Sequence, residues 1–528
     1  MRLIQTADLT VERLAGLSAL DRELIYNGLD TMVTLEVMEA LLPQFDNTTQ
    51  GTYNFSRDLQ GPILEMMVRG LLVDQPRRYR VLADVKASIK RLAHNLDRII
   101  REGIGTQVSW RSPAQLSNLL YNVLGIPPKR KRGAQGMYPT TNREALEFLG
   151  ANYLLAEPIC THLLALRDLD KKRQLLETGI DSDGRMRTNF NIAGTNTGRL
   201  ASAISDFGTG TNLQNIDREL RSIFIADPGM KLANLDLEQA DARNVGSICW
   251  DLFVRTHGQS FAGAYLDACE SGDLHTTVCR MAWGDLGWGR DPSAFRRVAD
   301  QIAYRSLSYR DLAKKLGHGT NYFGTPRTMA RHTKVDRGTI EAFQRNYFAA
   351  FPAIGSFERT RDDLDNWHNR VRRQLREDSY LTTLLGRRRY FFGRWNDDET
   401  LRAAIAYAPQ SMTADEIDQG MLRLFRAQRG IQLLVQVHDS VLIQYPEERE
   451  AEIVPWALNE MRIHIPLEEG RDFVVPTEAK VGWNWGDASG DNEDGLVKWK
   501  SVGDSRRRSE TTHHHQSLSD QLRCSAAS

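Results

Sequence analysis

The sequence has few cysteines and no long apolar run. Its five cysteines, at positions 160, 249, 269, 279 and 524, form no CxxC pair, which argues against a structural zinc site and for a reducing compartment. The first residues are interrupted by Arg, Asp and Glu, so we expect no signal peptide. No stretch of about 18 apolar residues could span a membrane. We therefore expect an intracellular protein without a membrane partner.

An excess of charge of either sign is also missing. The 68 basic and 68 acidic residues cancel, so net charge gives no hint of a nucleic-acid partner. Basic runs do occur locally, at 77–80, 129–132 and 387–389, and each is either a solvated surface or a phosphate-binding segment. A length of 528 residues predicts several subdomains. We read 127–136 as a flexible basic loop and 487–528, which has few large apolar residues, as a mostly disordered tail.

The segment Leu232–Arg243 places one carboxylate, Asp236, at the end of an apolar run that reads as a strand, followed by a helix start. A buried carboxylate is costly unless something compensates its charge. Arg243 offers a salt bridge, and a helix N-terminus or a metal ion are the other solutions. The segment alone leaves these readings open.

A second carboxylate lies between two apolar arms in Leu433–Tyr445, which reads as a β-hairpin with His438, Asp439 and Ser440 at its tip. A tip aspartate is often only a turn residue. Together, however, Asp236 and Asp439 would form a hard oxygen site suited to Mg²⁺. Two such ions about 4 Å apart can stabilise both oxygens of a phosphoryl displacement, which makes nucleotidyl transfer and nuclease chemistry the candidates.

A predicted helix over 310–322 supplies a candidate ligand for a triphosphate. Its polar residues at every fourth position form one stripe, made of Arg310, Lys314, His318 and Tyr322. The two cations could hold phosphates while the later rings face a sugar and base. Gly317 and Gly319 weaken a helix, so we expect them to serve close approach. A solvent-facing basic helix is the alternative.

These blocks together resemble the family A DNA polymerases of the bacterial polymerase I type, in a phage-like or plasmid-like version without extra domains. The family pattern D-Y-S-Q-x-E-x-R is matched by Asp236–Arg243, and H-D-E by His438–Ser440. The pattern R-xxx-K-xxx-[FY]-G-xx-Y-G is matched by Arg310–Phe323. Shorter blocks match in order at 197–202, 212–216, 273–275 and 386–389, and the resemblance covers about 55–485.

The resemblance implies an α+β, right-hand fold with an antiparallel palm sheet and helical fingers and thumb. It places a remnant of a 3′–5′ exonuclease-like domain at 1–50, the thumb at 51–180, palm at 181–254 and 366–486, and fingers at 255–365. It implies DNA-directed DNA synthesis with two Mg²⁺ ions, on primer–template DNA with deoxynucleoside triphosphates. It further implies a cytoplasmic location in a bacterial or phage-infected cell and leaves room for a separate exonuclease or processivity subunit.

The resemblance also assigns roles to single residues. The implied metal ligands are Asp236, Asp439 and the Leu237 carbonyl, and Lys314 is the implied proton donor to pyrophosphate. The implied nucleotide-binding residues are Arg310, Lys314, His275, Gln239, Asp241, His318 and Tyr322. The implied contacts to DNA, made in the minor groove where correct base pairs share acceptors, are Arg199, Gln214, Arg243, Arg402, Gln410 and His438.

The sequence departs from the family pattern at four of these positions. Asp241 stands where the family has Glu, and His318 where it has Phe or Tyr, two positions that exclude a ribose 2′-hydroxyl in the family. We hypothesise that an Asp241–His318 hydrogen bond replaces this sugar gate. Ser440 replaces a Glu, which puts a three-carboxylate site in doubt, and Phe323 replaces a Gly.

Tyr26 and Asp30 resemble the last motif of the family's proofreading exonuclease, but no other acidic block precedes them. A two-metal nuclease cannot be assembled from Asp30 alone, so we expect no proofreading from this chain, which is either a form that lost the exonuclease or a part of a longer or split product. A single-subunit RNA polymerase, a reverse transcriptase and a noncatalytic DNA-binding protein are the rival readings. The acid at 241 and the minor-groove blocks favour DNA synthesis.

Overall fold

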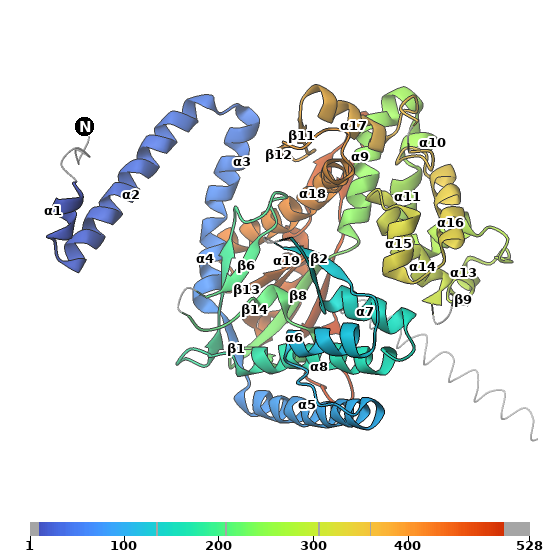
Figure 1. Ribbon diagram of the computed structural model, residues 1–528. Coiled ribbons are helices and arrows are strands. Elements are labelled where there is room, and N and C mark those ends of the chain that lie inside the picture. The colour runs from blue at the N-terminus through green and yellow to red at the C-terminus, as the bar shows by residue number, and fades with distance from the viewer. Residues whose placement is uncertain (1–9, 134–135, 206–207, 305–306, 360, 501–528) are drawn as a thin grey trace, which may run out of the picture. The chain divides into compact units, whose positions relative to one another are not determined.

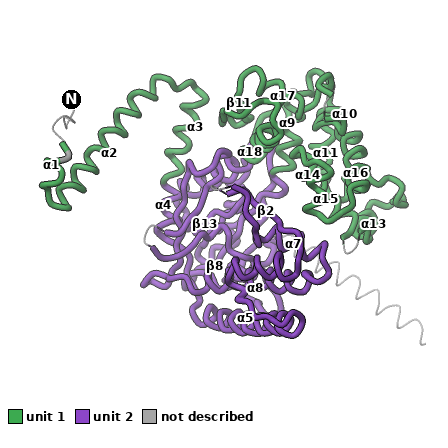
Figure 2. The backbone as a smooth tube through the Cα atoms, in the orientation of Figure 1, with its two compact units in different colours: residues 1–60, 241–412, 465–471 green, residues 61–240, 413–464, 472–528 purple. Residues whose placement is uncertain are grey.

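The computed structural model describes residues 10–133, 136–205, 208–304, 307–359 and 361–500. The chain divides into two compact units (Figure 2). The first unit comprises residues 1–60, 241–412 and 465–471, and the second comprises 61–240, 413–464 and 472–528. Within the described ranges, every helix is either too short or too polar to serve as a membrane span.

The second unit contains a five-stranded sheet in the order β13-β14-β8-β17-β18 (Figure 1). All four pairings are antiparallel, with β8 (Met230–Leu237) in the centre between β14 (Ser440–Pro446) and β17 (Thr477–Gly482). Side chains alternate along β8, so that Leu235 is buried while its neighbours Asn234 and Asp236 are only half-buried. The strand thus presents Asp236 on its less buried face.

The predicted hairpin is confirmed. The strands β13 (Gln432–Val437) and β14 pair with Val437 opposite Ser440, which leaves His438 and Asp439 as a two-residue turn. The turn contains neither Gly nor Asn, and His438 itself adopts the left-handed φ of 57° that such turns need.

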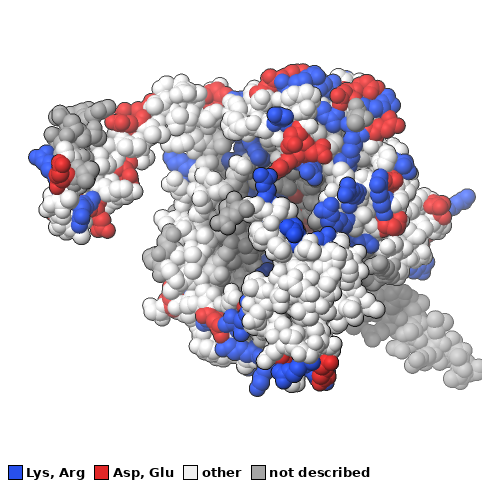
Figure 3. Space-filling view, viewed as in Figure 1, with Lys and Arg blue, Asp and Glu red and all other residues white. Residues whose placement is uncertain are grey.

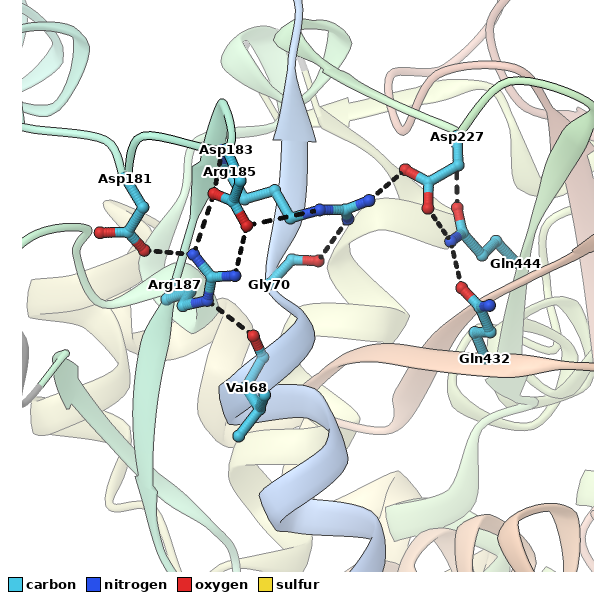
Figure 4. Close-up of polar contacts among 9 residues, drawn as sticks. All are labelled: Val68, Gly70, Asp181, Asp183, Arg185, Arg187, Asp227, Gln432 and Gln444. Atoms are coloured by element: carbon cyan, nitrogen blue, oxygen red, sulfur yellow. Dashed lines mark hydrogen bonds and ion pairs between the residues drawn. The ribbon is translucent and has the colours of Figure 1, made fainter.

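A partly buried polar network lies at the end of the hairpin opposite to its turn (Figure 4). The Gln444 amide donates to Asp227 (2.8 Å) and to Gln432 (2.6 Å), while Arg185 donates to the other oxygen of Asp227 (2.5 Å). Arg187 donates to Asp183 (2.6 Å) and to a carbonyl of α4 (2.6 Å). Because a one-residue slip of either hairpin strand would separate Gln444 from Gln432 and Asp227, these bonds favour the observed register.

In the same unit the long helix α5 (Gln75–Ile104) packs against α8 (Glu157–Glu177). The apolar periodicity of 81–100 predicted this helix, and Asp74 caps its start while Gly105 ends it with a φ of 77°. The other elements of this unit are α4 (Gln60–Arg69), β1 (Leu71–Val73), α6 (Pro113–Ser117), η3 (Asn118–Val123), β2 (Arg130–Gly133), β3 (Gly136–Pro139), α7 (Arg143–Asn152), β4 (Arg185–Met186), β5 (Thr188–Asn191), β6 (Ala201–Ile204), η4 (Leu213–Asn215), η5 (Arg218–Ile223), β7 (Phe224–Ile225), η7 (Glu447–Arg449), α19 (Glu450–Glu460), β16 (Asp472–Val474) and β18 (Val497–Lys498). The strand β15 (His464–Pro466) has its first residue in this unit and the other two in the first unit.

The first unit is mainly helical, and its core gathers aromatic rings. Tyr347 of α16 (Arg337–Ala350) contacts Tyr265, Phe343 and Phe351, and its hydroxyl donates to Asn321 (2.8 Å). The other elements are α1 (Val11–Ala15), α2 (Ala19–Leu41), η2 (Leu42–Gln44), α3 (Asn47–Asp58), α9 (Ala240–His257), α10 (Gln259–Ala262), α11 (Ala264–Glu270), α12 (Leu274–Ala282), η6 (Pro292–Ala294), α13 (Phe295–Ala299), β9 (Ile302–Tyr304), β10 (Leu307–Ser308), α14 (Tyr309–Asn321), α15 (Pro326–Thr333), α17 (Trp367–Glu377), β11 (Tyr380–Thr382), β12 (Arg388–Tyr390), α18 (Asp398–Ala427), which continues into the second unit, and η8 (Glu468–Gly470).

The predicted α+β class is confirmed, but two local predictions are wrong. The basic segment 127–136 was expected to be a flexible loop, yet Lys131 of β2 pairs with Tyr138 of β3 in an antiparallel hairpin. The tail was expected to be disordered from 487, yet β18 pairs with β17 and Leu496 is only 6% exposed. Leu496, the strand pairing and the buried Asn492, which exchanges hydrogen bonds with Asn484 (2.8 and 3.0 Å), order this polar segment, and composition does not reveal such contacts. Residues 501–528 lie outside the described residues.

Candidate active site

Asp236 and Asp439 lie at the same end of the sheet in the second unit. Asp236 is paired in register with Ser440 on one side and with Glu478 on the other. The amide of Leu237 donates to the carbonyl of Asp439 (3.0 Å), so the backbone ties the hairpin turn to the end of β8. The two aspartates that the sequence predicted to act together are thus adjacent.

The electrostatics of Asp236 show that its charge is poorly compensated. Burial, together with the nearby charges of Asp439 and Glu478, raises the pKa of Asp236 from 3.8 to about 7, against a smaller lowering by Lys480 and Arg218. Desolvation and like charges both disfavour an ionised carboxylate. A cation bound beside Asp236 would remove this penalty.

The donor set fits a hard divalent cation. Carboxylate and carbonyl oxygens are the ligands that Mg²⁺ prefers, and Asp236, Asp439 and the Leu237 carbonyl supply oxygen only. Among the described residues no three His, Cys, Asp or Glu side chains are grouped so that they could hold a metal ion. Glu478 is therefore a charged neighbour of Asp236, and the predicted metal site rests on two carboxylates and a carbonyl.

Sequence reasoning missed a residue that supports the hairpin turn. The Gln436 side chain is 3% exposed and donates to the His438 carbonyl (2.5 Å), while its own oxygen accepts from Gln214 (2.9 Å). Gln214 also accepts from Ser202 (2.8 Å). A glutamine amide between Val435 and Val437 in an apolar strand was the available signal, because a buried amide needs partners.

In the first unit, α14 carries the predicted cationic stripe. The helix starts at a capping box formed by Ser308 and Asp311, as is typical of strong helix N-termini. The opposite face of the helix is buried and carries Leu312, Ala313 and Leu316. The stripe lies on the predicted helix except for its last member, Tyr322, which is the C-cap residue and packs edge-on against His318 with ring centroids 4.7 Å apart.

The two glycines of α14 differ in their roles. A Cβ at Gly319 would lie 2.9 Å from the terminal methyl group of Met329, so α14 and α15 approach closely there, although this flexible side chain could move aside for a larger residue. A Cβ at Gly317 would lie 3.6 Å from Tyr347, an ordinary contact. No close approach within the described residues therefore requires glycine at 317.

A cluster of positive charge surrounds His275 at the start of α12. The N-cap residue Asp273 accepts from Arg310 (3.1 Å). Burial, followed by the charges of Arg310 and Lys314, lowers the pKa of His275 from 6.5 to about 4. Although burial raises the pKa of Asp273, hydrogen bonds from Arg310 and Thr276 lower it to about 2. The structure thus brings Arg310, Lys314 and His275 together, with a neutral imidazole at neutral pH and an excess of positive charge suited to an anion.

Protein-family profiles identify the family to which the chain belongs. A family profile described as DNA polymerase family A matches residues 79–286 and 288–487. The chain belongs to DNA polymerase family A. This membership confirms the resemblance to family A that the motifs indicated, while the phage-like or plasmid-like version stays a prediction.

Individual family A relatives are similar over most of the chain. It is 26% identical over 482 residues to a thermostable DNA polymerase I of Thermus filiformis, covering 87% of this chain and 51% of that relative. It is 29% identical over 411 residues to DNA polymerase I of Mycobacterium leprae, covering 73% of this chain and 39% of the relative. The chain therefore spans about half the length of these relatives or less.

A solved family A structure shares the fold. The POL domain of Pol1 from M. smegmatis, in complex with DNA primer-template and dNTP, superposes with a TM-score of 0.62 and 25% identity, covering 81% of this chain and 69% of that one. This likeness confirms the predicted right-hand polymerase fold class.

The remaining predicted residues of the family A site fall in both units. Gln239 follows β8 with a left-handed φ of 54°, and its side-chain oxygen is buried with no hydrogen-bond partner among the described residues. Asp241 lies in the first turn of α9, where Arg243 is buried. The second unit holds Arg199, Gln214 and His438, and the first unit holds Asp241, Arg243, His318, Tyr322, Arg402 and Gln410.

The pKa of Asp236 gives the metal-free protein a characteristic pH dependence. Because the folded pKa of about 7 lies above 3.8, the folded state keeps a proton that the unfolded state releases. The free energy of unfolding should therefore fall as pH rises from about 4 to 7 and level off above it. Asp236→Asn should lose this contribution and gain stability relative to wild type across the window, measured by urea unfolding in EDTA.

The exposed residue Asp285 provides the control, since Asp285→Asn should keep a constant difference from wild type. A difference for Asp236→Asn that stays equally constant between pH 4 and 7 would contradict the account of Asp236 as a poorly compensated carboxylate.

Proposed function

We propose that this chain is a template-directed DNA polymerase that adds deoxynucleotides to a primer 3′ end, in replication or repair. The observation that carries the proposal is the pairing of Asp236 and Asp439 at one end of the sheet, with a pKa for Asp236 raised to about 7. A metal-dependent phosphoryl-transfer site needs such carboxylates. The predicted limits of thumb, palm and fingers belong to the same proposal.

The carboxylates and the backbone define the proposed metal site. Asp236, Asp439 and the Leu237 carbonyl would hold two Mg²⁺ ions, which supply stabilisation of the attacking 3′ oxygen and the leaving oxygen of the triphosphate. The hydrogen bond from the Leu237 amide to the Asp439 carbonyl (3.0 Å) holds the hairpin turn with Asp439 against the end of β8, which carries Asp236. Rigid elements hold reacting groups more precisely than loops do.

The cationic cluster of the first unit would bind the incoming nucleotide. Arg310, Lys314 and His275 would hold its triphosphate, with Lys314 as the proton donor to pyrophosphate. Tyr322 and His318 would face the sugar and base, and the buried oxygen of Gln239, which lacks a partner among the described residues, would accept from the nucleotide.

Primer–template DNA is the proposed macromolecular partner, and the M. smegmatis relative was solved with primer-template and dNTP. The side chains proposed to contact DNA in the minor groove are Arg199, Gln214, Arg243, Arg402, Gln410 and His438. Basic and acidic side chains are intermixed on the face drawn in Figure 3. Affinity should therefore depend on individual phosphate contacts and fall with salt.

Primer extension on a DNA template tests the proposal directly. Asp439→Asn keeps the shape of the side chain but removes a metal ligand, so extension with deoxynucleotides should fall by roughly a thousandfold or more. Asp472→Asn is the control, because Asp472 is exposed and pairs only at the surface with His464 (2.6 Å).

Two further arms of this experiment test the rival readings. Ribonucleotides should be poor substrates, and efficient incorporation of them would favour an RNA polymerase instead. A mismatched primer incubated with Mg²⁺ but without nucleotides should keep its length, since we propose no proofreading by this chain. Equal activity of Asp439→Asn and Asp472→Asn would overturn the proposed chemistry.

The sugar gate gives a separate prediction about nucleotide selection. We infer that His318 and Asp241, both in the first unit, form the contact that excludes a ribose 2′-hydroxyl. If so, His318→Phe should shift the preference for deoxy- over ribonucleotides by about tenfold, the loss expected for one hydrogen bond to a charged group. His332→Phe, at an exposed position on α15, is the control. Unchanged ribo- and dideoxynucleotide discrimination in His318→Phe would show the inference to be wrong.

A further inference from the structure

Asp273 is shared by two arginines from different elements of the first unit. Its Oδ1 accepts from Arg310 of α14 at 3.1 and 3.3 Å, and its Oδ2 accepts both from Arg310 (3.3 Å) and from Arg296 of α13 (3.4 Å). A single carboxylate thus holds the proposed phosphate ligand Arg310 and a second guanidinium side by side. Arg296 was not among the residues that the sequence singled out.

The position of α13 is fixed against α12, the helix that carries His275. The Arg280 guanidinium of α12 lies 3.9 Å from the ring centroid of Phe295, and that ring also packs edge-on against Trp288. Trp288 in turn donates to the Trp283 carbonyl (2.8 Å). These contacts give Arg296 a defined place although its side chain is 56% exposed.

The charge of Arg296 also reaches the proposed triphosphate site. Besides burial, Arg310 and Lys314, the charge of Arg296 contributes to the lowered pKa of His275. Asp273 and Asp300 are the carboxylates that face Arg296, and both accept from it. The charges that act on His275 are thus three cations, Arg310, Lys314 and Arg296, and one carboxylate, Asp273, and this excess of positive charge suits an anion with several charges.

We propose that Arg296 is a further binding residue for the triphosphate of the incoming nucleotide, held beside Arg310 by their common partner Asp273. The proposal rests on the proposed polymerase function. Guanidinium groups suit phosphate because their planar fork donates two parallel hydrogen bonds. An approaching triphosphate would accept from both arginines, while Asp273 keeps them oriented.

A surface ion pair is the alternative role for Arg296. Its Nε donates to Asp300 one helical turn away (2.8 Å), and exposed pairs of this kind contribute little to stability. The two roles predict different effects of removing Asp300. If Arg296 serves only this pair, Asp300→Asn and Arg296→Gln should behave alike.

Steady-state primer extension with varied dATP separates these roles. Arg296→Gln should raise the KM for dATP roughly fivefold, as expected for one charge-assisted contact at an exposed site, with kcat changed by less than about twofold. Arg296→Lys should recover part of the loss. Arg297→Gln, the neighbouring exposed arginine, and Asp300→Asn are the controls and should keep the wild-type KM.

The outcomes distinguish this inference from the proposed function. A KM for Arg296→Gln equal to that of Arg297→Gln, or a matching rise in Asp300→Asn, would overturn the role of Arg296 while leaving polymerase activity established. If wild type and Arg297→Gln both fail to extend the primer, the proposed function itself fails. Thermal unfolding of each variant verifies that the fold is intact.

Discussion

The candidate site depends on two carboxylates of like charge, Asp236 and Asp439, which the fold holds next to each other at one end of the sheet. Antiparallel pairing sets Asp236 opposite Ser440, and the Leu237 amide donates to the Asp439 carbonyl. Burial and the repulsion of neighbouring carboxylates raise the pKa of Asp236 to about 7. The hydrogen bonds and apolar packing of the sheet hold this unfavourable arrangement in place, and perturbed carboxylates of this kind are typical of functional sites.

Buried glutamine amides support the tight turn and the open end of the hairpin. Gln444 anchors the open end of the hairpin to Asp227, while Gln436 anchors the turn by donating to the His438 carbonyl. The first unit has the complementary chemistry, since Asp273 orients Arg310 and the cations lower the pKa of His275 to about 4. One unit thus carries the carboxylates of the proposed metal site, and the other carries the cations proposed to bind a polyphosphate.

The sequence predicted those features that local patterns encode. Alternating apolar residues placed Asp439 at a hairpin turn, and a fourfold spacing placed Arg310 and Lys314 on one helix. Features that depend on distant pairing were missed. Glu478 faces Asp236 only through the register of β17, and Leu496 is buried only because β18 joins the same sheet. Asp273 matched a family block, but its bond to Arg310 joins residues 37 positions apart.

The central claim is that Asp236 and Asp439 act as one unit on the same bound ions. A double-mutant cycle in primer extension tests it most directly, with Asp236→Asn, Asp439→Asn and the double variant assayed under single-turnover conditions. Residues that act as a unit show strongly non-additive losses. The account predicts that the double variant is about as slow as the slower single variant. Losses that multiply in the double variant would contradict it.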